Sequence, residues 1–439
     1  MGSPRLAGNW QRNRRLSQLA AAFLFAFLAS AVVGFDAWIV TSIQQAKNSD
    51  FFQFWAAGRT ILQGNDPYEP LDWRQIYEQE GHWRWQTDQP VFLYPLRTAF
   101  PFVPLALLPV SAAFLVWTLV SEALLFASVV FLTRVLSWTT NNSWLLVTLA
   151  TAMAFEPVSL TILFGQMGIV LLCFVAGSLY LTSRGRYAQA GVLLALTLIK
   201  PQLFLLVYPV LIVTMILRRR WSFLAGFATT VVALFVSSWL LVPHLLGAWQ
   251  AYVGRSATVR FSLSPTIWGA SHSVAVALHR EDLWPIVGAS ALAALLGILT
   301  FALFARRRVM AEPGNLQTGL SLSMLASLLI APYVLSYDFA LLLLPISTCL
   351  WMTHRLAQPI LTMLVTSVLG CAVILPWALL AVSLMTGQET ASVVIPLSLF
   401  VILLATAYGR NRTHGLPPLP DQMRPHHLDG TSGGTVCPL

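Results

Sequence analysis

Residues 111–133, SAAFLVWTLVSEALLFASVVFLT, decide the class of this fold. Glu122 is the only charged residue in this largely apolar run, which Arg134 follows. A helix of about 20 apolar residues crosses the roughly 30 Å hydrocarbon core of a bilayer. Of the 439 residues, 57% are hydrophobic and 10% are charged, whereas soluble proteins carry about 25% charged residues. The sequence therefore predicts an all-α polytopic membrane protein.

Further apolar segments lie on both sides of this run. Together they predict about twelve crossings, with residues 187–217 counted as two short arms. Basic residues cluster in the short connectors, which places those connectors and both termini in the cytosol. The other segments are 16–40, 144–161, 166–183, 187–217, 221–243, 284–305, 316–331, 338–353, 358–384 and 391–408. We expect a cytosolic tail at 1–15, one transmembrane domain at 16–408 and a disordered cytosolic tail at 409–439.

The net charge of +9 suits cytosolic loops and anionic lipid headgroups. No RNA- or DNA-binding motif is present, so we expect membrane lipid and no nucleic acid as a partner. The four cysteines form no CxxC pair, which argues against a disulfide framework and a zinc site. No P-loop, G-x-G-x-x-G or H-E-x-x-H motif occurs. No metal site or cofactor is predicted, and a divalent metal stays an open alternative.

Residues 187–217 have basic clusters at both ends and Lys200-Pro201-Gln202 in the middle. Two cytosolic ends require an even number of crossings. At 1.5 Å per residue each arm spans roughly 20 Å, less than the ~30 Å core. The segment is therefore predicted to be a short hairpin with its apex inside the membrane, where Lys200 faces a protein-lined cavity. A lysine extending to the interface is the alternative.

The outer loop at residues 44–110 is unusually long, and long loops are functional or disordered. Its many aromatic residues argue against disorder. Residues 51–63, FFQFWAAGRTILQ, have the pattern of an amphipathic helix lying in the membrane interface. Residues 94–109 contain four prolines, which predicts a short interfacial or re-entrant piece. The loop holds seven of the 17 acids: Asp50, Asp66, Glu69, Asp72, Glu78, Glu80 and Asp88.

Asp50 stands at the entrance to this loop, where water meets lipid. One interpretation is a helix N-cap, because Asp50 precedes the predicted helix at 51–63 and aspartate is favoured there. The other is a general base, which contributes roughly 10²–10⁴-fold to a rate. Glu122 lies near the middle of its span, and we interpret it as a paired structural residue.

Several short motifs, in this order and spacing, resemble glycosyltransferase family 87, a family of the GT-C superfamily of membrane enzymes. The resemblance runs from about residue 45 to 345. The residues that carry it are Asn48-Ser49-Asp50-Phe51, Ala57-Gly58-Arg59, Gly64-Asn65-Asp66-Pro67-Tyr68, Tyr94-Pro95, Leu105-Ala106-Leu107-Leu108-Pro109, Gly165-Gln166, Ala190-Gly191, Lys200-Pro201-Gln202, Ala331-Pro332-Tyr333 and Tyr337-Asp338.

The resemblance implies a GT-C-like hexosyltransferase that moves a sugar, chiefly mannose, from a polyprenyl-phosphate donor to a glycan or glycolipid acceptor. It implies an active site on the outer, periplasmic face of a bacterial inner membrane, with Asp50 at the position of the family's catalytic aspartate. A lipid-phosphate leaving group needs a cation, and Lys200 is the first candidate. Weaker candidates are Arg255, Arg260 and His272 in the second outer loop, residues 244–283, where a solvated surface role is the alternative.

The other residues that the resemblance singles out are candidates for substrate binding, and each has a structural alternative. These alternatives are headgroup anchoring for Arg59, capping for Gln166 and Asp338, and the ordinary aromatic belt of a membrane protein for the tyrosines. The candidates are Arg59, Tyr68, Gln166, Tyr337 and Asp338.

A transporter or flippase is the alternative function, because about twelve spans is also a common transporter count. Transporters often have two related halves and polar residues at the midplane, and this sequence has neither pattern. Its polar residues gather at the predicted outer face, which favours the enzyme.

Overall fold

The computed structural model describes residues 43–80, 91–136, 142–243, 263–305, 313–353 and 359–413, with the single positions 34 and 37. All regular elements in these ranges are helical, which confirms the all-α class. The α-helices of the first half are α2 (Ile43–Asn48), α3 (Phe51–Leu62), α4 (Pro70–Gln79), α5 (Val110–Val135), α6 (Asn142–Ala154), α7 (Glu156–Leu163), α8 (Gly168–Ser183), α9 (Tyr187–Leu196), α10 (Val207–Leu217) and α11 (Trp221–Leu241).

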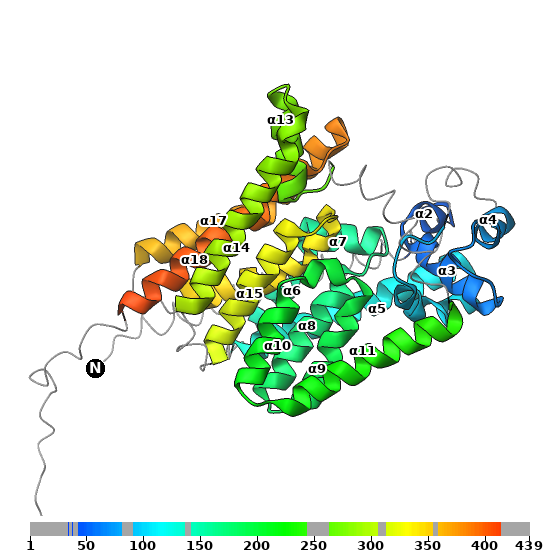
Figure 1. The fold of residues 1–439 in the computed structure, drawn as a ribbon, viewed down its shortest axis with the longest axis horizontal. Helices are drawn as coiled ribbons and strands as arrows, with labels where there is room; N and C mark the ends of the chain where they lie inside the picture. Colours follow the sequence, from blue (N-terminus) through cyan, green and yellow to red (C-terminus); the bar gives the residue numbers. More distant parts are fainter. Residues whose placement is uncertain are drawn as a thin grey trace, which may run out of the picture.

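The helices of the second half lie beside the first group (Figure 1). They are α13 (Ile267–Ala277), α14 (Trp284–Ala305), α15 (Pro313–Ile330), α16 (Leu343–Thr353), α17 (Pro359–Thr386) and α18 (Val394–Thr413). Short 3-10 helices connect many of these elements: η1 (Leu96–Thr98), η2 (Phe100–Phe102), η3 (Leu105–Leu107), η4 (Thr197–Ile199), η5 (Pro201–Phe204), η6 (Glu281–Leu283), η7 (Ser336–Leu342) and η8 (Thr390–Val393).

Three segments of the described chain are long and apolar enough to cross a bilayer: Val110–Val135, Trp221–Leu241 and Glu281–Thr300. Helices α7 and α8 add a fourth if they are one broken span, since they meet at a bend of 119°. The predicted number of twelve is therefore not confirmed. Among the described residues, shorter apolar helices of 10–17 residues lie at or near five more of the expected segments: Tyr187–Ile199, Val207–Leu217, Leu316–Ile330, Ser336–Met352, Val373–Thr386 and Thr390–Thr406.

The predicted ends of the chain fall largely outside the described residues. The tail at 1–15 and most of the first span at 16–40 lie there, as do residues 414–439. Helix α18 continues to Thr413, so the predicted boundary between the last span and the tail at 408/409 falls inside a helix. The apolar run ends earlier than the helix because backbone hydrogen bonding continues into the polar residues after Tyr408.

The predicted hairpin at 187–217 is present. Helix α9 runs to Leu196, the 3-10 turns η4 and η5 follow, and α10 ends at Leu217. Lys200 stands between the two turns with φ −137° and ψ 70°, outside the helical region. Proline at 201 explains the break, because the residue before a proline is disfavoured in α-helical conformation.

Helices α9 and α11 cross at two glycines. A Cβ atom on Gly191 would run into the backbone carbonyl of Phe223, and one on Gly226 would run into that of Ala188. Small residues at such crossings let two helix backbones approach closely, which is a common way to pack helices in membranes. This crossing fixes the first arm of the Lys200 hairpin against the long helix α11.

The described residues of the predicted outer loop form a unit of α2, α3, α4 and the three turns η1–η3, at one end of the molecule (Figure 1). The Pro-rich segment 94–109 forms those turns and not a span, as predicted. Helix α3 is also present, but nine of its twelve residues are buried. Its Phe54 ring packs on Phe102 at 5.0 Å and on Tyr94 at 4.9 Å between centroids. The helix therefore forms the core of the loop and does not lie with one face against lipid, because the Pro-rich turns and α4 cover it.

Candidate active site

Asp50 lies at the junction of α2 and α3. The turn is held by a hydrogen bond from the Phe52 amide to the Ser49 carbonyl at 3.1 Å. Asp50 has helical backbone angles, and its side chain makes no capping hydrogen bond to α3. Its carboxylate oxygen Oδ2 instead accepts a hydrogen bond from Gln166 Nε2 at 2.7 Å. The carboxylate is thus directed toward another part of the chain and does not cap its own helix.

Gln166 follows α7 in a tight loop that packs directly under Asp50. The Phe51 amide donates to the Phe164 carbonyl at 2.9 Å, and Trp117 Nε1 donates to the Gly165 carbonyl at 3.0 Å. Gly165 has φ +64°, and a Cβ there would lie 2.5 Å from the Cβ of Phe51. Glycine is therefore required both by the left-handed backbone and by the close approach of α3. This loop places the fully buried Gln166 side chain against Asp50.

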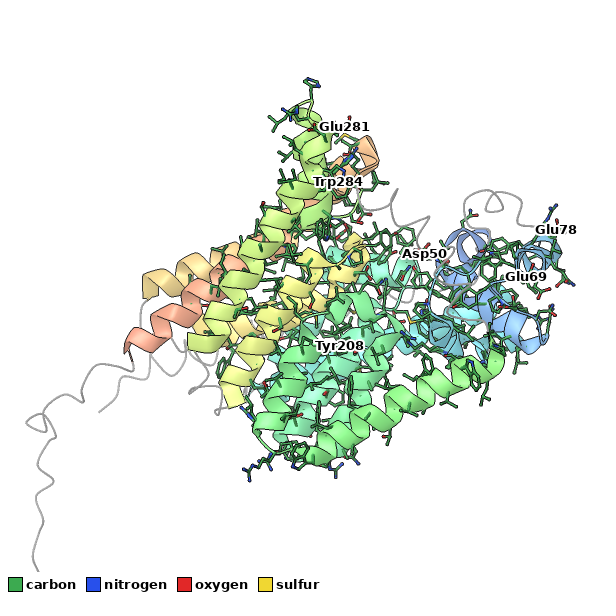
Figure 2. All side chains as sticks on the ribbon, in the orientation of Figure 1. Asp50, Glu69, Glu78, Tyr208, Glu281 and Trp284 are labelled. Atoms are coloured by element: carbon green, nitrogen blue, oxygen red, sulfur yellow. The ribbon has the colours of Figure 1, made fainter. Side chains whose placement is uncertain are left out.

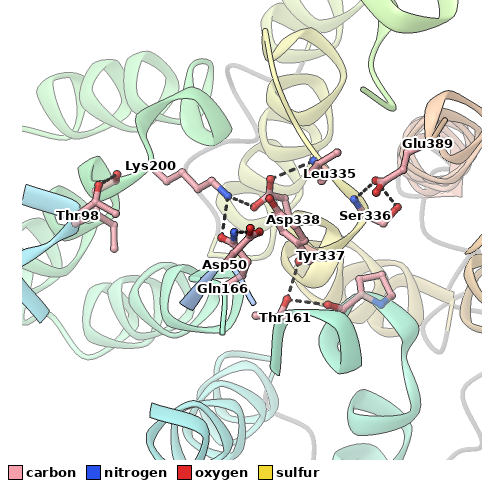
Figure 3. A network of polar contacts seen from close by, with 12 residues as sticks. Asp50, Thr98, Thr161, Gln166, Lys200, Leu335, Ser336, Tyr337, Asp338 and Glu389 are labelled. Atoms are coloured by element: carbon pink, nitrogen blue, oxygen red, sulfur yellow. Dashed lines mark hydrogen bonds and ion pairs between the residues drawn. The ribbon is translucent and has the colours of Figure 1, made fainter. Parts of the chain in front are cut away.

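Lys200 reaches the same point from the hairpin apex (Figure 3). Its ammonium Nζ lies 2.5 Å from Asp338 Oδ1 and 3.5 Å from Gln166 Oε1, and the residue is 1% exposed. The rings of Tyr337 and Tyr94 lie 5.0 Å and 5.8 Å from Nζ, within cation–π range. Protein therefore encloses the Lys200 side chain, and the position of the apex inside the membrane stays a prediction.

The hairpin apex is fastened to the outer loop by two hydrogen bonds. Arg97 Nε donates to the Leu198 carbonyl, and Thr98 Oγ1 donates to the Ile199 carbonyl, each at 2.6 Å. Both acceptors belong to the 3-10 turn η4 just before Lys200. The broken hairpin leaves carbonyls without helical partners, and the Pro-rich segment satisfies them.

Asp338 belongs to the 3-10 helix η7. Its amide donates to the Leu335 carbonyl at 2.8 Å, and its Oδ2 accepts from the Leu335 amide at 3.3 Å. The second oxygen thus caps η7 while the first binds Lys200. The Tyr337 carbonyl lies 2.7 Å from Thr161 Oγ1 of α7, which ties η7 to the helix that leads to Gln166. Of the two roles left open for Asp338, the capping contact is present, and the binding of a sugar hydroxyl stays a prediction.

Four of the sequence candidates are therefore brought together, as Figure 3 shows: Asp50, Gln166, Lys200 and Asp338. Tyr337 borders them through its ring. We call the four residues the Asp50–Asp338 cluster.

The remaining candidates lie elsewhere. Arg59 donates to the Ala106 carbonyl at 3.1 Å, and the Tyr68 hydroxyl donates to the Tyr94 carbonyl at 2.6 Å. Both contacts stay within the outer loop. His272 of α13 packs edge-on at 6.3 Å from Trp284, which lies apart from Asp50 in Figure 2. Arg255 and Arg260 lie outside the described residues.

Two acids near the cluster were missed from the sequence. Glu389, between α17 and α18, accepts from the Ser336 amide at 2.6 Å and from the Ser336 hydroxyl at 2.8 Å. Burial raises the pKa of Glu389, and the charges of Asp338 and Asp50 raise it further. Glu156, at the start of α7, is 1% exposed, and its Oε1 has no hydrogen-bond partner among the described residues. Glu389 had a sequence signal, since it is the one acid between residues 359 and 409.

Tyr77 of α4 was also missed. Its ring packs edge-on against Phe52 at 4.9 Å. Burial raises the pKa of its phenol, and the nearby charge of Asp50 raises it further. The Tyr77 phenol is therefore protonated at neutral pH, and its ring forms part of the apolar packing around Phe52.

The described residues contain no group of three or more His, Cys, Asp or Glu side chains placed to hold a metal ion. The arrangement does offer a carboxylate that is only partly buried, Asp50, backed by a buried amide and a buried ion pair. Such a carboxylate can accept a proton from a hydroxyl that reaches it from outside.

Comparison with known proteins identifies the family of the chain. The sequence profile of glycosyltransferase family 87 matches residues 92–332, more than half of the chain. No curated protein and no solved structure matches the chain. The matched region contains Gln166 and Lys200, whereas Asp50 and Asp338 lie outside it. The family match favours the enzyme over the transporter. The chain therefore belongs to glycosyltransferase family 87, and we identify it as a membrane glycosyltransferase.

Proposed function

We propose that this protein transfers a hexose, most simply mannose, from a polyprenyl-phosphate carrier to a hydroxyl of a glycan or glycolipid, with Asp50 as the general base. The reaction would take place on the periplasmic face of a bacterial inner membrane. The observation that carries the proposal is the Asp50 carboxylate: it does not cap α3 and accepts a 2.7 Å hydrogen bond from Gln166 where three distant segments meet.

The proposed step is a direct displacement at the anomeric carbon. Asp50 takes the proton as the acceptor O–H bond breaks, and the acceptor oxygen forms a bond to the anomeric carbon. The bond from that carbon to the phosphate oxygen breaks, and its electron pair leaves with the lipid phosphate. The configuration at the anomeric carbon is inverted, and the carrier leaves as polyprenyl phosphate.

Exposure supports Asp50 over Asp338 and Glu156 as the base. Asp338 is fully buried and paired with Lys200, and Glu156 is also buried. Glu389 is partly exposed, like Asp50, but its carboxylate accepts two hydrogen bonds from Ser336. Asp50 is the partly exposed acid of the cluster and so the one that an acceptor hydroxyl can approach. A base must come within hydrogen-bonding distance of the proton it removes.

Lys200 is the proposed cation for the donor phosphate. An ammonium has three N–H donors, and among the described residues Asp338 and Gln166 take two of them. The ammonium is 1% exposed, so in this proposal its positive charge stabilises the leaving phosphate oxygen from within the protein, without direct contact. The contributions predicted for Arg255, Arg260 and His272 remain predictions.

The proposal is tested by transfer of label from polyprenyl-phosphate [14C]mannose, and in parallel from the glucose analogue, in membranes that contain the full chain. Asp50→Asn should lower transfer by at least about 10²-fold, because the amide cannot take the proton. Glu78→Gln is the matched control, since it removes an acid of the same loop that is exposed and pairs with Arg74. It should transfer normally. Normal transfer by Asp50→Asn, or no wild-type transfer from either donor, would refute the proposal.

A further inference from the structure

We infer that Gln166, Lys200 and Asp338 are positioning residues that hold Asp50 in one orientation and in its ionised form, and that Gln166 and Asp338 are not sugar subsites. The inference rests on the proposed role of Asp50 as the base. It concerns how the rest of the Asp50–Asp338 cluster acts on that base.

The order of groups in the cluster allows one arrangement of hydrogen bonds. An ammonium can only donate, and an ionised carboxylate can only accept. The Gln166 amide stands between the two, with Oε1 3.5 Å from Lys200 Nζ and Nε2 2.7 Å from Asp50 Oδ2. Turned over, the amide would set its donor against the ammonium and its acceptor against the carboxylate. Lys200 therefore selects the orientation in which Gln166 donates to Asp50.

Asp338 keeps Lys200 on the far side of that amide. Its Oδ1 lies 2.5 Å from Nζ, and both side chains are buried. The neutral Gln166 amide lies between Lys200 Nζ and Asp50 Oδ2. A hydrogen bond donated to a carboxylate favours its ionised form.

The positioning residues and the base differ in how far their side chains are exposed. Gln166 and Asp338 are 0% exposed and Lys200 is 1% exposed, whereas Asp50 is partly exposed. Gln166 is also held through its backbone, since its amide donates to the Thr161 carbonyl at 2.8 Å. A sugar hydroxyl at Gln166 or Asp338 would have to displace one of these buried contacts. The geometry therefore fits residues that act through Asp50.

The first test is Gln166→Met, which keeps the length and unbranched shape of the side chain but removes both hydrogen bonds. We expect kcat to fall by about 10²-fold, the loss that a misplaced catalytic group produces. The acid limb of the pH–rate profile should move to higher pH, since a carboxylate that has lost a donor is protonated more easily. The donor KM should stay within about twofold. A raised donor KM with an unshifted acid limb would identify a sugar contact and overturn the inference.

Gln166→Glu separates the two contacts of the amide. A glutamate still accepts from Lys200 but places a carboxylate against Asp50. The acid limb should therefore shift further than in Gln166→Met. Gln317→Met is the matched control: Gln317 is also buried and donates to Thr348 Oγ1 at 3.1 Å, but it lies near the opposite end of α15 from η7. The pH–rate profile of Gln317→Met should match that of the wild type. An unshifted limb in Gln166→Glu would overturn the inference.

The second test replaces the ion pair by apolar residues in Lys200→Met/Asp338→Leu, which leaves no charge unpaired. If the pair acts through Gln166, adding Gln166→Met should move the acid limb no further than the larger of the two separate shifts. If the shifts of the acid limb add up in the triple variant, the ion pair and Gln166 act independently on Asp50, and the inference is overturned. Failure of the inference is distinguishable from failure of the proposed function: Asp50→Asn would still be inactive in the first case and active in the second.

Discussion

Glu389 and Ser336 are joined by two hydrogen bonds, at 2.6 Å from the Ser336 amide and at 2.8 Å from its hydroxyl. They are separated by 53 residues of sequence. The contact fastens the connection between α17 and α18 to the start of η7, two residues before Asp338. The C-terminal helices, which the sequence left without a functional role, therefore support the Asp50–Asp338 cluster.

Stability should depend on pH through Glu389. Burial raises its pKa above the ordinary value of 4.5, so the folded protein binds the proton more tightly than the unfolded chain does. Its contribution to stability is then present below pH 4.5 and is lost as the pH rises through the folded pKa. Glu389→Gln cannot ionise and keeps an oxygen that accepts from Ser336. Its stability relative to the wild type should rise with pH across that window.

Thermal unfolding of purified protein in detergent between about pH 4 and pH 8 measures this difference. Glu78→Gln, at an exposed acid, serves as the control. Unfolding curves of Glu389→Gln and the wild type that keep the same separation at every pH would contradict the prediction.

Asp338→Asn should destabilise the fold by about 3–5 kcal/mol, the cost of removing one partner of a buried ion pair. Lys200 would keep its charge at 1% exposure without its carboxylate. Lys200→Met/Asp338→Leu should recover most of that stability because it leaves no buried charge. Denaturation in detergent measures both variants. A single variant as stable as the wild type would show that the ion pair contributes nothing to folding.

Gly226→Ala should weaken the crossing of α9 and α11 by about 1–3 kcal/mol, since the added methyl group would run into the Ala188 carbonyl. The matched control is Gly297→Ala in α14, where a Cβ has no neighbour within 4 Å. That change should be neutral or slightly stabilising, because alanine is the better helix former. Thermal unfolding of Gly226→Ala and Gly297→Ala measures the difference. Equal unfolding midpoints would contradict the close approach of α9 and α11 at Gly226.

Gly165→Ala should lower both stability and transfer. A left-handed backbone costs a non-glycine residue about 1–2 kcal/mol, and the methyl group would also collide with Phe51, next to Asp50. Gly185→Ala isolates the first effect, since Gly185 has φ +74° and open space around its Cβ position. We expect Gly185→Ala to keep its transfer rate. Equal rates in the two variants would show that the Gly165 loop does not set the position of Asp50.

The sequence predicted much of the fold because apolar runs record which segments avoid water. Residues 111–133, 221–243 and 284–305 became long helices close to the expected bounds. The broken hairpin around Lys200 and the Pro-rich turns at 94–109 were also foreseen, since proline removes a backbone donor and a helical conformation. The number of spans was not confirmed, because apolar composition alone does not show where a helix bends, as α7 and α8 do at Gly165 and Gln166.

The sequence by itself determined the helical membrane class and the membership of glycosyltransferase family 87. It also singled out Asp50, Gln166, Lys200 and Asp338 as separate candidates. Only the tertiary structure decided that these four residues meet, that Asp50 does not cap its helix and that Glu389 supports the cluster. The contacts span 116 residues from Asp50 to Gln166 and 138 residues from Lys200 to Asp338. Hydrophobic patterns report the solvent of each segment, whereas such contacts depend on how helix breaks from distant segments pack against one another.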